Sequence, residues 1–149
     1  MLDFLKVACV VPDIKVADCA FNTQEILNKL NGCTEDSLIV LPELCITGYT
    51  AGDLFFDSAL QQSALKSVAR IMKETAGKSY AAVLGAPLVL FGQLYNCAVV
   101  LSGGKILGIV PKTFIPVYNE FYEKRWFSCA SDLKQKEVYI PALSSEPIP

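Results

Sequence analysis

Short apolar runs and amphipathic stretches alternate along the first half of the chain. Leu5 to Val11 and Ser37 to Leu41 are almost entirely apolar, which is typical of strands buried on both faces of a sheet. Between them, Asp18 to Leu30 carries apolar residues at roughly helical spacing, and Asn31-Gly32 supplies a stop signal. Strand, helix and strand in this order predict a βαβ unit.

A second amphipathic stretch follows the irregular segment Pro42 to Phe56. Ser58 to Thr75 has apolar residues at helical steps, with Asp57 as a plausible cap and Gly77 as the end of the helix. This pattern predicts a second helix, followed by a third strand over Tyr80 to Ala86.

A hairpin is predicted next, since the apolar runs Leu94 to Leu101 and Lys105 to Val110 flank Ser102-Gly103-Gly104. The sheet is therefore expected to be mixed, with parallel βαβ units first and an antiparallel hairpin after them. With 149 residues, the chain fits one α/β layered domain. Pattern alone leaves a flavodoxin-like fold equally possible.

The absence of histidine from the chain narrows the chemistry most. A Ser-His-Asp or Cys-His triad and a His-ligated zinc site are excluded, so acid–base chemistry falls to Glu, Asp, Lys, Cys or Tyr. No metal site is predicted. Six cysteines without a CxxC pair are interpreted as reduced thiols of an intracellular protein.

Charge and hydropathy argue against a nucleic-acid-binding protein and a membrane protein. The net charge is −2 and no Lys/Arg cluster occurs, so a nucleic-acid surface is not expected. No run reaches the roughly 18 apolar residues of a membrane helix, and no signal peptide is recognisable. We therefore expect a cytoplasmic protein without a membrane partner.

Two charged residues directly follow predicted strands. Glu43 follows the strand over Ser37 to Leu41, and Lys112 follows the strand over Lys105 to Val110. Ligands of open α/β sheets bind at the carboxyl ends of strands, where a carboxylate can act as a general base. Taken singly, each position favours an ordinary solvated residue. Lys112 has apolar neighbours, however, and a semi-buried cation needs a partner such as Glu43 or Glu120.

The segment after Lys112 combines aromatic and acidic side chains suited to a small polar substrate: Tyr118, Glu120, Tyr122, Glu123 and Trp126. The hydroxyl of Tyr118 is able to donate a hydrogen bond to such a substrate, or its ring serves only for packing.

Two motifs make the sequence resemble the nitrilase superfamily of carbon–nitrogen hydrolases. LIVLPELCITGYTAGDLFF (Leu38 to Phe56) resembles the family's first signature, and GKILGIVPKTFIPVYNEFYEKRWF (Gly104 to Phe127) resembles its lysine segment. The continuations GDLF and NEFYEKRWF are especially similar to glutamine-dependent NAD synthetases. LYNCAVVLSGGKILG (Leu94 to Gly108) fits the family's hairpin, so the resemblance covers nearly the whole chain.

The resemblance implies an α-β-β-α sandwich, of which this chain forms a part, and a Glu-Lys-Cys catalytic set. Glu43 matches the general base and Lys112 the residue that supports the oxyanion. Tyr118 matches the position that holds glutamine, and Tyr49 one that lines the same pocket. Glu120 matches a second glutamate near the lysine. The family's cysteine lies well after the lysine, and Cys45 and Cys129 are poor candidates for it.

We therefore expect residues 1–149 to be the N-terminal portion of a glutaminase domain, without its nucleophile, without a second domain and inactive alone. The resemblance implies that the full enzyme hydrolyses glutamine and passes ammonia to an ATP-dependent NAD synthetase domain. It further implies that the full enzyme uses ATP, Mg and deamido-NAD in addition to glutamine, whereas this chain alone has no cofactor. The full-length enzyme is expected to be a homo-oligomer. The alternatives are another amidase or carbamoylase of the superfamily, or a non-catalytic subunit that binds a partner.

Overall fold

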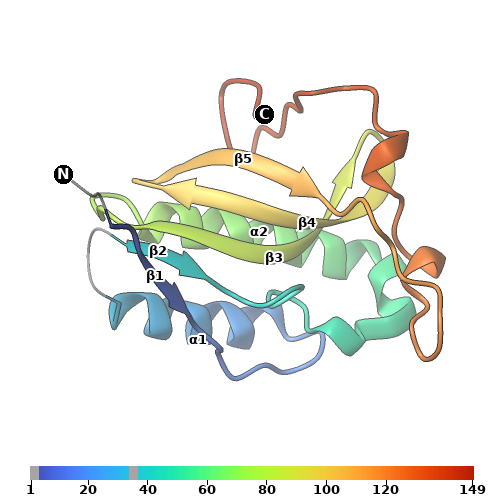
Figure 1. The fold of residues 1–149 in the computed structure, drawn as a ribbon, viewed down its shortest axis with the longest axis horizontal. Coiled ribbons are helices and arrows are strands. Elements are labelled where there is room, and N and C mark those ends of the chain that lie inside the picture. Colours follow the sequence, from blue (N-terminus) through green and yellow to red (C-terminus); the bar gives the residue numbers. More distant parts are fainter. Residues whose placement is uncertain (1–3, 34–36) are drawn as a thin grey trace.

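Five strands form one mixed sheet in this computed structural model, which describes residues 4–33 and 37–149 (Figure 1). The strands lie side by side in chain order: β1 (Lys6–Cys9), β2 (Ser37–Val40), β3 (Ala81–Leu90), β4 (Gln93–Ser102) and β5 (Lys105–Pro111). β1, β2 and β3 are parallel, whereas β4 and β5 are antiparallel to their neighbours. The predicted α/β class with a mixed sheet is confirmed.

Two α-helices provide the parallel crossovers, α1 (Cys19–Asn31) and α2 (Ser58–Glu74). Each begins at an aspartate whose side chain accepts a hydrogen bond from a free N–H of the first turn. Asp18 accepts from the backbone of Phe21 at 3.0 Å, and Asp57 accepts from that of Ala59 at 2.7 Å. The cap predicted at Asp57 is therefore present.

Strand β3 runs to Leu90, four residues beyond the predicted end at Ala86. The reason lies in the pairing of Pro87 with Asn96 on β4. The backbone carbonyl of Asn96 faces β5, where it accepts a hydrogen bond from the N–H of Lys112 at 2.8 Å. It therefore needs no donor from β3, and proline, which has no N–H, can occupy the paired position. A two-residue turn at Phe91 and Gly92, both with positive φ, then closes the hairpin.

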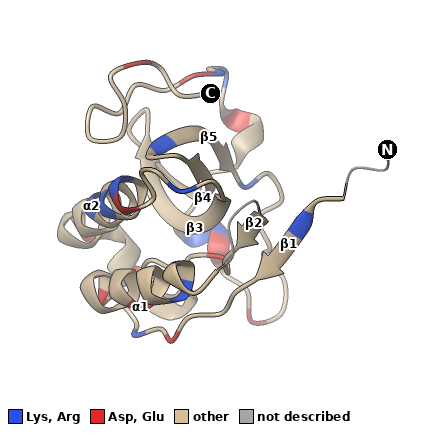
Figure 2. Ribbon diagram, turned by 90° about the vertical axis from the view of Figure 1, so that its left-hand side faces the viewer, with Lys and Arg blue, Asp and Glu red and all other residues tan. Residues whose placement is uncertain are grey.

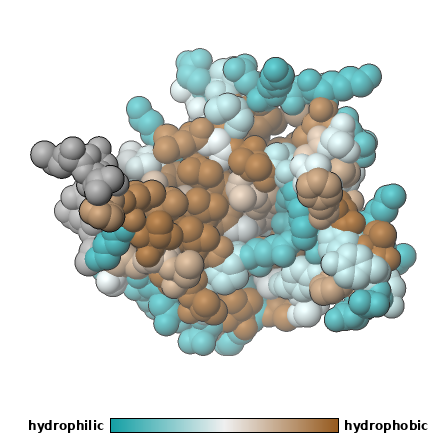
Figure 3. Space-filling model, viewed as in Figure 1, coloured by the Kyte–Doolittle hydropathy of each residue, from teal (hydrophilic) through white to brown (hydrophobic). Residues whose placement is uncertain are grey.

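The two faces of the sheet differ. α1 and α2 lie together on one face (Figure 2) and cover side chains such as Ile39, Leu84 and Val99, each fully buried. The opposite face carries the alternate residues, among them Val7 and Val110, which are more than half exposed. Figure 3 shows the resulting hydrophobic area over the strands. No helix within the described ranges is long and apolar enough to cross a membrane.

The last residues return to the outer edge of the sheet. Val138 and Ile148 form an isolated antiparallel bridge, and the carbonyl of Pro149 accepts a hydrogen bond from Ile109 of β5 at 2.8 Å. Ile148 is buried at 2% exposure. The outer edge of β5 is thus paired at Ile109, which reduces the hazard of edge-to-edge association there.

Candidate active site

A tight turn after β2 positions Glu43. The backbone N–H of Leu41 still pairs with Val83 of β3, at 2.9 Å, and the N–H groups of Thr47 and Gly48 then return to the carbonyl of Leu44. Leu44 itself has a positive φ of 51°. The chain therefore reverses directly over the neighbouring strand.

The close approach of this turn to β3 requires the glycine at position 85. A Cβ atom on Gly85 would lie 2.3 Å from the nitrogen of Leu44 and 2.7 Å from the carbonyl oxygen of Pro42. Both are backbone atoms that cannot yield without moving Glu43. The position of the glutamate thus depends on a residue without a side chain.

Lys112 is held by its backbone on two sides immediately after β5. Its N–H donates to the carbonyl of Asn96 at 2.8 Å, and its carbonyl accepts from Ala130 at 3.0 Å. The lysine therefore leaves the sheet from a fixed point, and its side chain turns toward the Glu43 turn.

The ammonium of Lys112 lies between two carboxylates. Its Nζ is 2.7 Å from Oε1 of Glu43, and 3.0 and 2.9 Å from the two carboxylate oxygens of Glu123. Of the two partners considered for Lys112 in the sequence, Glu43 is the one that the structure provides. We refer to Glu43, Lys112 and Glu123 as the charged triad.

The structure places Glu123, and not Glu120, beside the lysine. Glu120 is exposed and follows Asn119, whose positive φ of 53° turns the chain outward. Glu123 begins a short 3-10 helix, η2 (Glu123–Arg125), and is only 2% exposed. The second glutamate of the site is therefore Glu123.

A signal for this choice exists in the sequence. The N–H of Phe127 donates to the carbonyl of Glu123 at 2.9 Å, as across one helical turn. Residues at this spacing share one side of a turn, and Phe127 is buried at 3% exposure. The spacing from Glu123 to the core aromatic residue Phe127 is the sequence signal that favours Glu123, whereas Glu120 was predicted from the family resemblance.

Tyr49 extends the network. Its hydroxyl donates to Oε1 of Glu123 at 2.7 Å. Burial, and then the adjacent carboxylate of Glu123, raise the pKa of Tyr49 well above its usual 10. The phenol therefore stays protonated and neutral, and acts as a donor to the triad.

The environment of Lys112 keeps it charged. Burial acts to lower the pKa of its ammonium, but the hydrogen bonds to Glu43 and Glu123 outweigh burial and raise the pKa above 10.5. A raised folded-state pKa stabilises the protein fully below the unfolded-state value, and this stabilisation is lost as pH rises through the folded-state value. Lys112 therefore stays charged throughout the neutral range.

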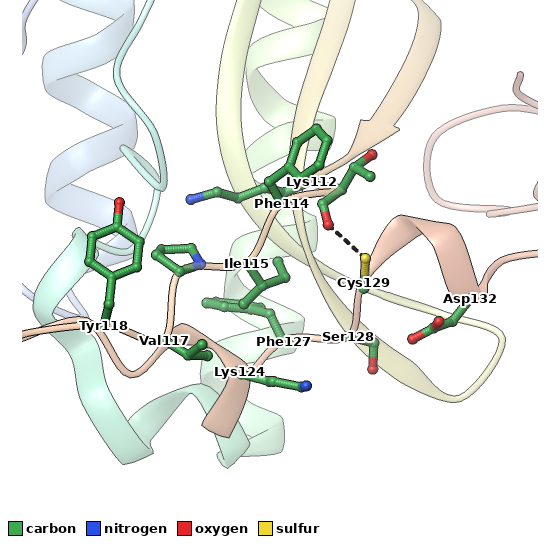
Figure 4. Close-up of a pocket in the computed structure, with 12 residues that line it drawn as sticks. Lys112, Phe114, Ile115, Val117, Tyr118, Lys124, Phe127, Ser128, Cys129 and Asp132 are labelled. Carbon is green, nitrogen blue, oxygen red and sulfur yellow. Dashed lines mark hydrogen bonds between the residues drawn. The ribbon is translucent and has the colours of Figure 1, made fainter.

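A cavity of about 720 Å³ adjoins the lysine, and Tyr118 lies on its wall (Figure 4). The Tyr118 side chain is 63% exposed and its ring meets that of Phe121 edge-on at 5.7 Å. No hydrogen bond among the described residues joins Tyr118 to the triad. The tyrosine is thus free to contact a molecule in the cavity, as the resemblance implies.

A second cavity, of about 590 Å³, opens on the uncovered face of the sheet. Glu43, Asn96 and Lys112 line it together with apolar strand residues that include Val40, Val83 and Val110. Since Lys112 also lines the cavity at Tyr118, its side chain is a shared wall of the two spaces.

No hydrogen bond within the described residues joins a cysteine thiol to the triad. Burial raises the pKa of Cys45 to about 11 and that of Cys97 to about 12, so neither is a ready thiolate. The thiol of Cys129 contacts the carbonyl of Thr113 at 2.6 Å. In Figure 4 it lies on the far side of the cavity from the Lys112 ammonium.

A contact that the sequence did not predict joins its two motifs. Both carboxylate oxygens of Asp53 accept from Arg125, at 2.7 and 2.9 Å, and one also accepts from the indole of Trp126 at 2.9 Å. Beside them the ring of Phe55 packs on Trp126 and Phe127, with centroids 5.8 and 4.9 Å apart. The Asp53 end of the first motif is thereby fixed to the segment that carries Glu123.

Replacing Phe55 by alanine is expected to lower the free energy of unfolding by about 3–5 kcal/mol, since a ring at 1% exposure leaves a cavity between the two motifs. Chemical denaturation of the purified protein measures this change. The adjacent Leu54→Ala, at a side chain 48% exposed, is the control and should cost less than about 1 kcal/mol. Equal losses for the two variants would contradict the packing role.

These observations define the class of the protein: an α/β sheet that brings a glutamate and a lysine together at its strand ends, without histidine. Residues 6–139 match the carbon-nitrogen hydrolase family, and the chain belongs to that family. More particularly, it is similar to the glutamine-dependent NAD(+) synthetase of Mycobacterium tuberculosis. The two are 35% identical over 124 residues, which cover 82% of this chain and 18% of the mycobacterial protein.

Solved structures agree with this relationship. The glutamine-dependent NAD(+) synthetase from Cytophaga hutchinsonii superposes with a TM-score of 0.81 at 25% identity, over 97% of this chain and 25% of that chain. The enzyme from Acinetobacter baumannii gives a TM-score of 0.77 at 31% identity, over 85% and 24% of the two chains. The predicted nitrilase-type fold is confirmed. The present chain spans a quarter or less of these relatives.

Proposed function

We propose that this chain supplies the glutamate and lysine of a glutaminase site that serves NAD synthesis. The observation that carries the proposal is the ammonium of Lys112, held by Glu43 and Glu123 at the carboxyl ends of strands. Residues 1–149 contain no histidine, and Glu43 is a carboxylate whose side chain is 42% exposed and open to a reactant, so it is the proposed general base.

In the proposed reaction, Glu43 takes the proton of a cysteine thiol that residues outside 1–149 supply. The thiolate attacks the side-chain amide carbon of glutamine, and Lys112 stabilises the oxyanion of the tetrahedral intermediate, an effect worth about 3–4 kcal/mol. Glu43 gives its proton to the leaving nitrogen, so that ammonia departs and a thioester remains. Water, deprotonated by Glu43, then attacks the thioester to release glutamate and the thiol.

The Tyr118 side of the site is proposed to hold the substrate. Tyr118 is exposed on the wall of the cavity beside Lys112, and its hydroxyl is able to donate to the polar end of glutamine. Tyr49 is proposed to act indirectly, by holding Glu123 in place, because its hydroxyl already donates to that carboxylate.

The uncovered face of the sheet fits one half of an α-β-β-α sandwich. Its exposed valines would be costly in water over so broad an area, and a second sheet would bury them. We propose that further polypeptide forms this second sheet, that the site is completed there, and that the ammonia passes to a synthetase domain that uses ATP, Mg and deamido-NAD.

Replacing Glu43 by glutamine in the full protein that contains this chain is expected to abolish ammonia release from glutamine, because the glutamine side chain cannot accept the thiol proton. The assay measures ammonia by a coupled enzyme. Glu74→Gln, at an exposed residue at the end of α2, is the control and should keep the wild-type rate. Near-normal release by Glu43→Gln would refute the proposed role. Release from other amides but not from glutamine would indicate another amidase.

A further inference from the structure

We propose that Asn96 is a positioning residue that holds the base of the proposed glutaminase site in its reactive orientation. The proposal rests on the proposed function. It starts from a buried side chain to which neither the sequence motifs nor the charged triad assigned a role. Asn96 lies in β4 and is only 4% exposed.

Asn96 contacts each member of the triad. Its side-chain amide donates a short hydrogen bond to Oε1 of Glu43 and a longer one, at 3.4 Å, to Oε2 of Glu123. Its backbone carbonyl accepts the N–H of Lys112. One residue of a central strand therefore fixes both the Glu43 carboxylate and the point from which the lysine departs.

The charge of the site explains why an amide is suited to this place. Two carboxylates face a single ammonium, so the triad carries one uncompensated negative charge. A neutral NH₂ group satisfies a lone pair on each carboxylate without changing that charge. A second cation would instead compete with Lys112 for Glu43, and an acid would add a third negative charge.

The two carboxylate oxygens of Glu43 have different surroundings. Oε1 accepts from both Lys112 and Asn96, whereas no hydrogen bond within the described residues engages Oε2. Two donors on one oxygen fix the direction of the carboxylate and leave the other oxygen to meet a thiol. Asn96 thus selects which oxygen serves as the base.

The first test is kinetic. Asn96→Leu replaces the side-chain amide by an apolar group of similar size and so removes both hydrogen bonds to the carboxylates. It is expected to lower kcat for ammonia release by about tenfold to a hundredfold. KM for glutamine should stay within about threefold, because Asn96 does not contact the Tyr118 side of the site. Asn96→Asp, which keeps the shape but replaces the donor by a carboxylate, should lose at least as much. An unchanged kcat in either variant of an active protein would overturn the proposal.

A matched control separates positioning from folding. Val99→Ala alters the same strand at a fully buried position that faces the helices. It should lower the melting temperature without changing kcat per folded molecule. If Val99→Ala reduced kcat as much as Asn96→Leu, strand packing would account for the effect and the positioning role would be wrong.

A second readout does not depend on amide hydrolysis. Trace acetylation of the whole protein with acetic anhydride, followed by peptide mass spectrometry, reports how readily the Lys112 amine reacts. Loss of Asn96 should loosen Glu43 from Lys112 and raise this rate by about threefold or more, with no change in Val99→Ala. An unchanged rate in Asn96→Leu would overturn the proposal. If the wild type released no ammonia from glutamine, the proposed function would fail, and this readout alone would decide the role of Asn96.

Discussion

Replacing Lys112 by methionine is expected to reduce kcat for ammonia release by about a hundredfold to a thousandfold, the usual effect of losing an oxyanion donor. The same change leaves Glu43 and the buried Glu123 facing each other without a cation. Glu123 is buried, but the side chains of Lys112 and Glu43 are 29% and 42% exposed, so we expect the loss of the cation to cost about 1–3 kcal/mol of stability. Few single substitutions in this chain should harm both activity and stability so strongly.

The pH dependence of this variant gives a sharper test. In the wild type, burial of Lys112 is outweighed by its hydrogen bonds to Glu43 and Glu123, which raise its pKa, so the stability that this shift contributes is lost as the pH rises through the folded-state pKa. The methionine variant has no ammonium and should not show this alkaline loss. Thermal unfolding at several pH values measures both.

Lys105→Met is the matched control for the lysine. Lys105 lies at the other end of β5 and is exposed. It should keep the wild-type kcat and pH dependence. If Lys112→Met behaved like this control, the triad would have no part in catalysis or stability.

Replacing Gly85 by alanine is the second change with a large expected effect. The new Cβ would collide with the backbone of Leu44 and Pro42, at 2.3 and 2.7 Å, so the turn that carries Glu43 must shift. We expect a loss of about 3 kcal/mol in the free energy of unfolding, the upper end of the usual range for overpacking, because the colliding atoms belong to the backbone. Molecules that still fold should have lost nearly all ammonia release, because Glu43 no longer reaches Lys112.

Gly108→Ala provides the comparison for Gly85→Ala. Gly108 lies in β5 of the same sheet, and a Cβ there would meet the carbonyl of Pro149 at an ordinary 3.5 Å. Its effect on stability should be below about 1 kcal/mol. Denaturant titration and the ammonia assay, run on both variants, decide whether close backbone approach is the cause. Similar results for the two glycines would argue against it.

The sequence was most informative where periodicity alone decides the structure. The two βαβ crossovers and the hairpin at Gly103-Gly104 follow from apolar spacing and turn residues, and all are present. The end of β3 was predicted too early: the strand continues through Pro87, a residue type that normally interrupts a central strand. Only the hydrogen-bonding direction of its partner Asn96 permits the strand to continue, and that direction is a property of the assembled sheet.

The sequence pattern predicted only those site residues that directly follow strands. Glu43 and Lys112 directly follow strands, so topology alone brings them to one end of the sheet. Glu123 and Asp53 instead depend on how an irregular segment folds back on the core, and no periodic pattern encodes that path. The roles of Tyr49 and Tyr118 remain predictions from the family resemblance.

The residues that meet in the site lie far apart in the sequence, so bringing them together costs conformational entropy. Lys112 is 69 positions from Glu43, and Tyr49 is 74 positions from Glu123. Closing a flexible loop of that length costs on the order of 4 kcal/mol, more than one partly exposed ion pair returns. The pairing of β2 to β5 in one sheet closes these loops, so the ion pair does not have to offset this cost alone. Ammonia release should therefore vanish together with the sheet during unfolding, so that catalysis becomes a sensitive reporter of strand register.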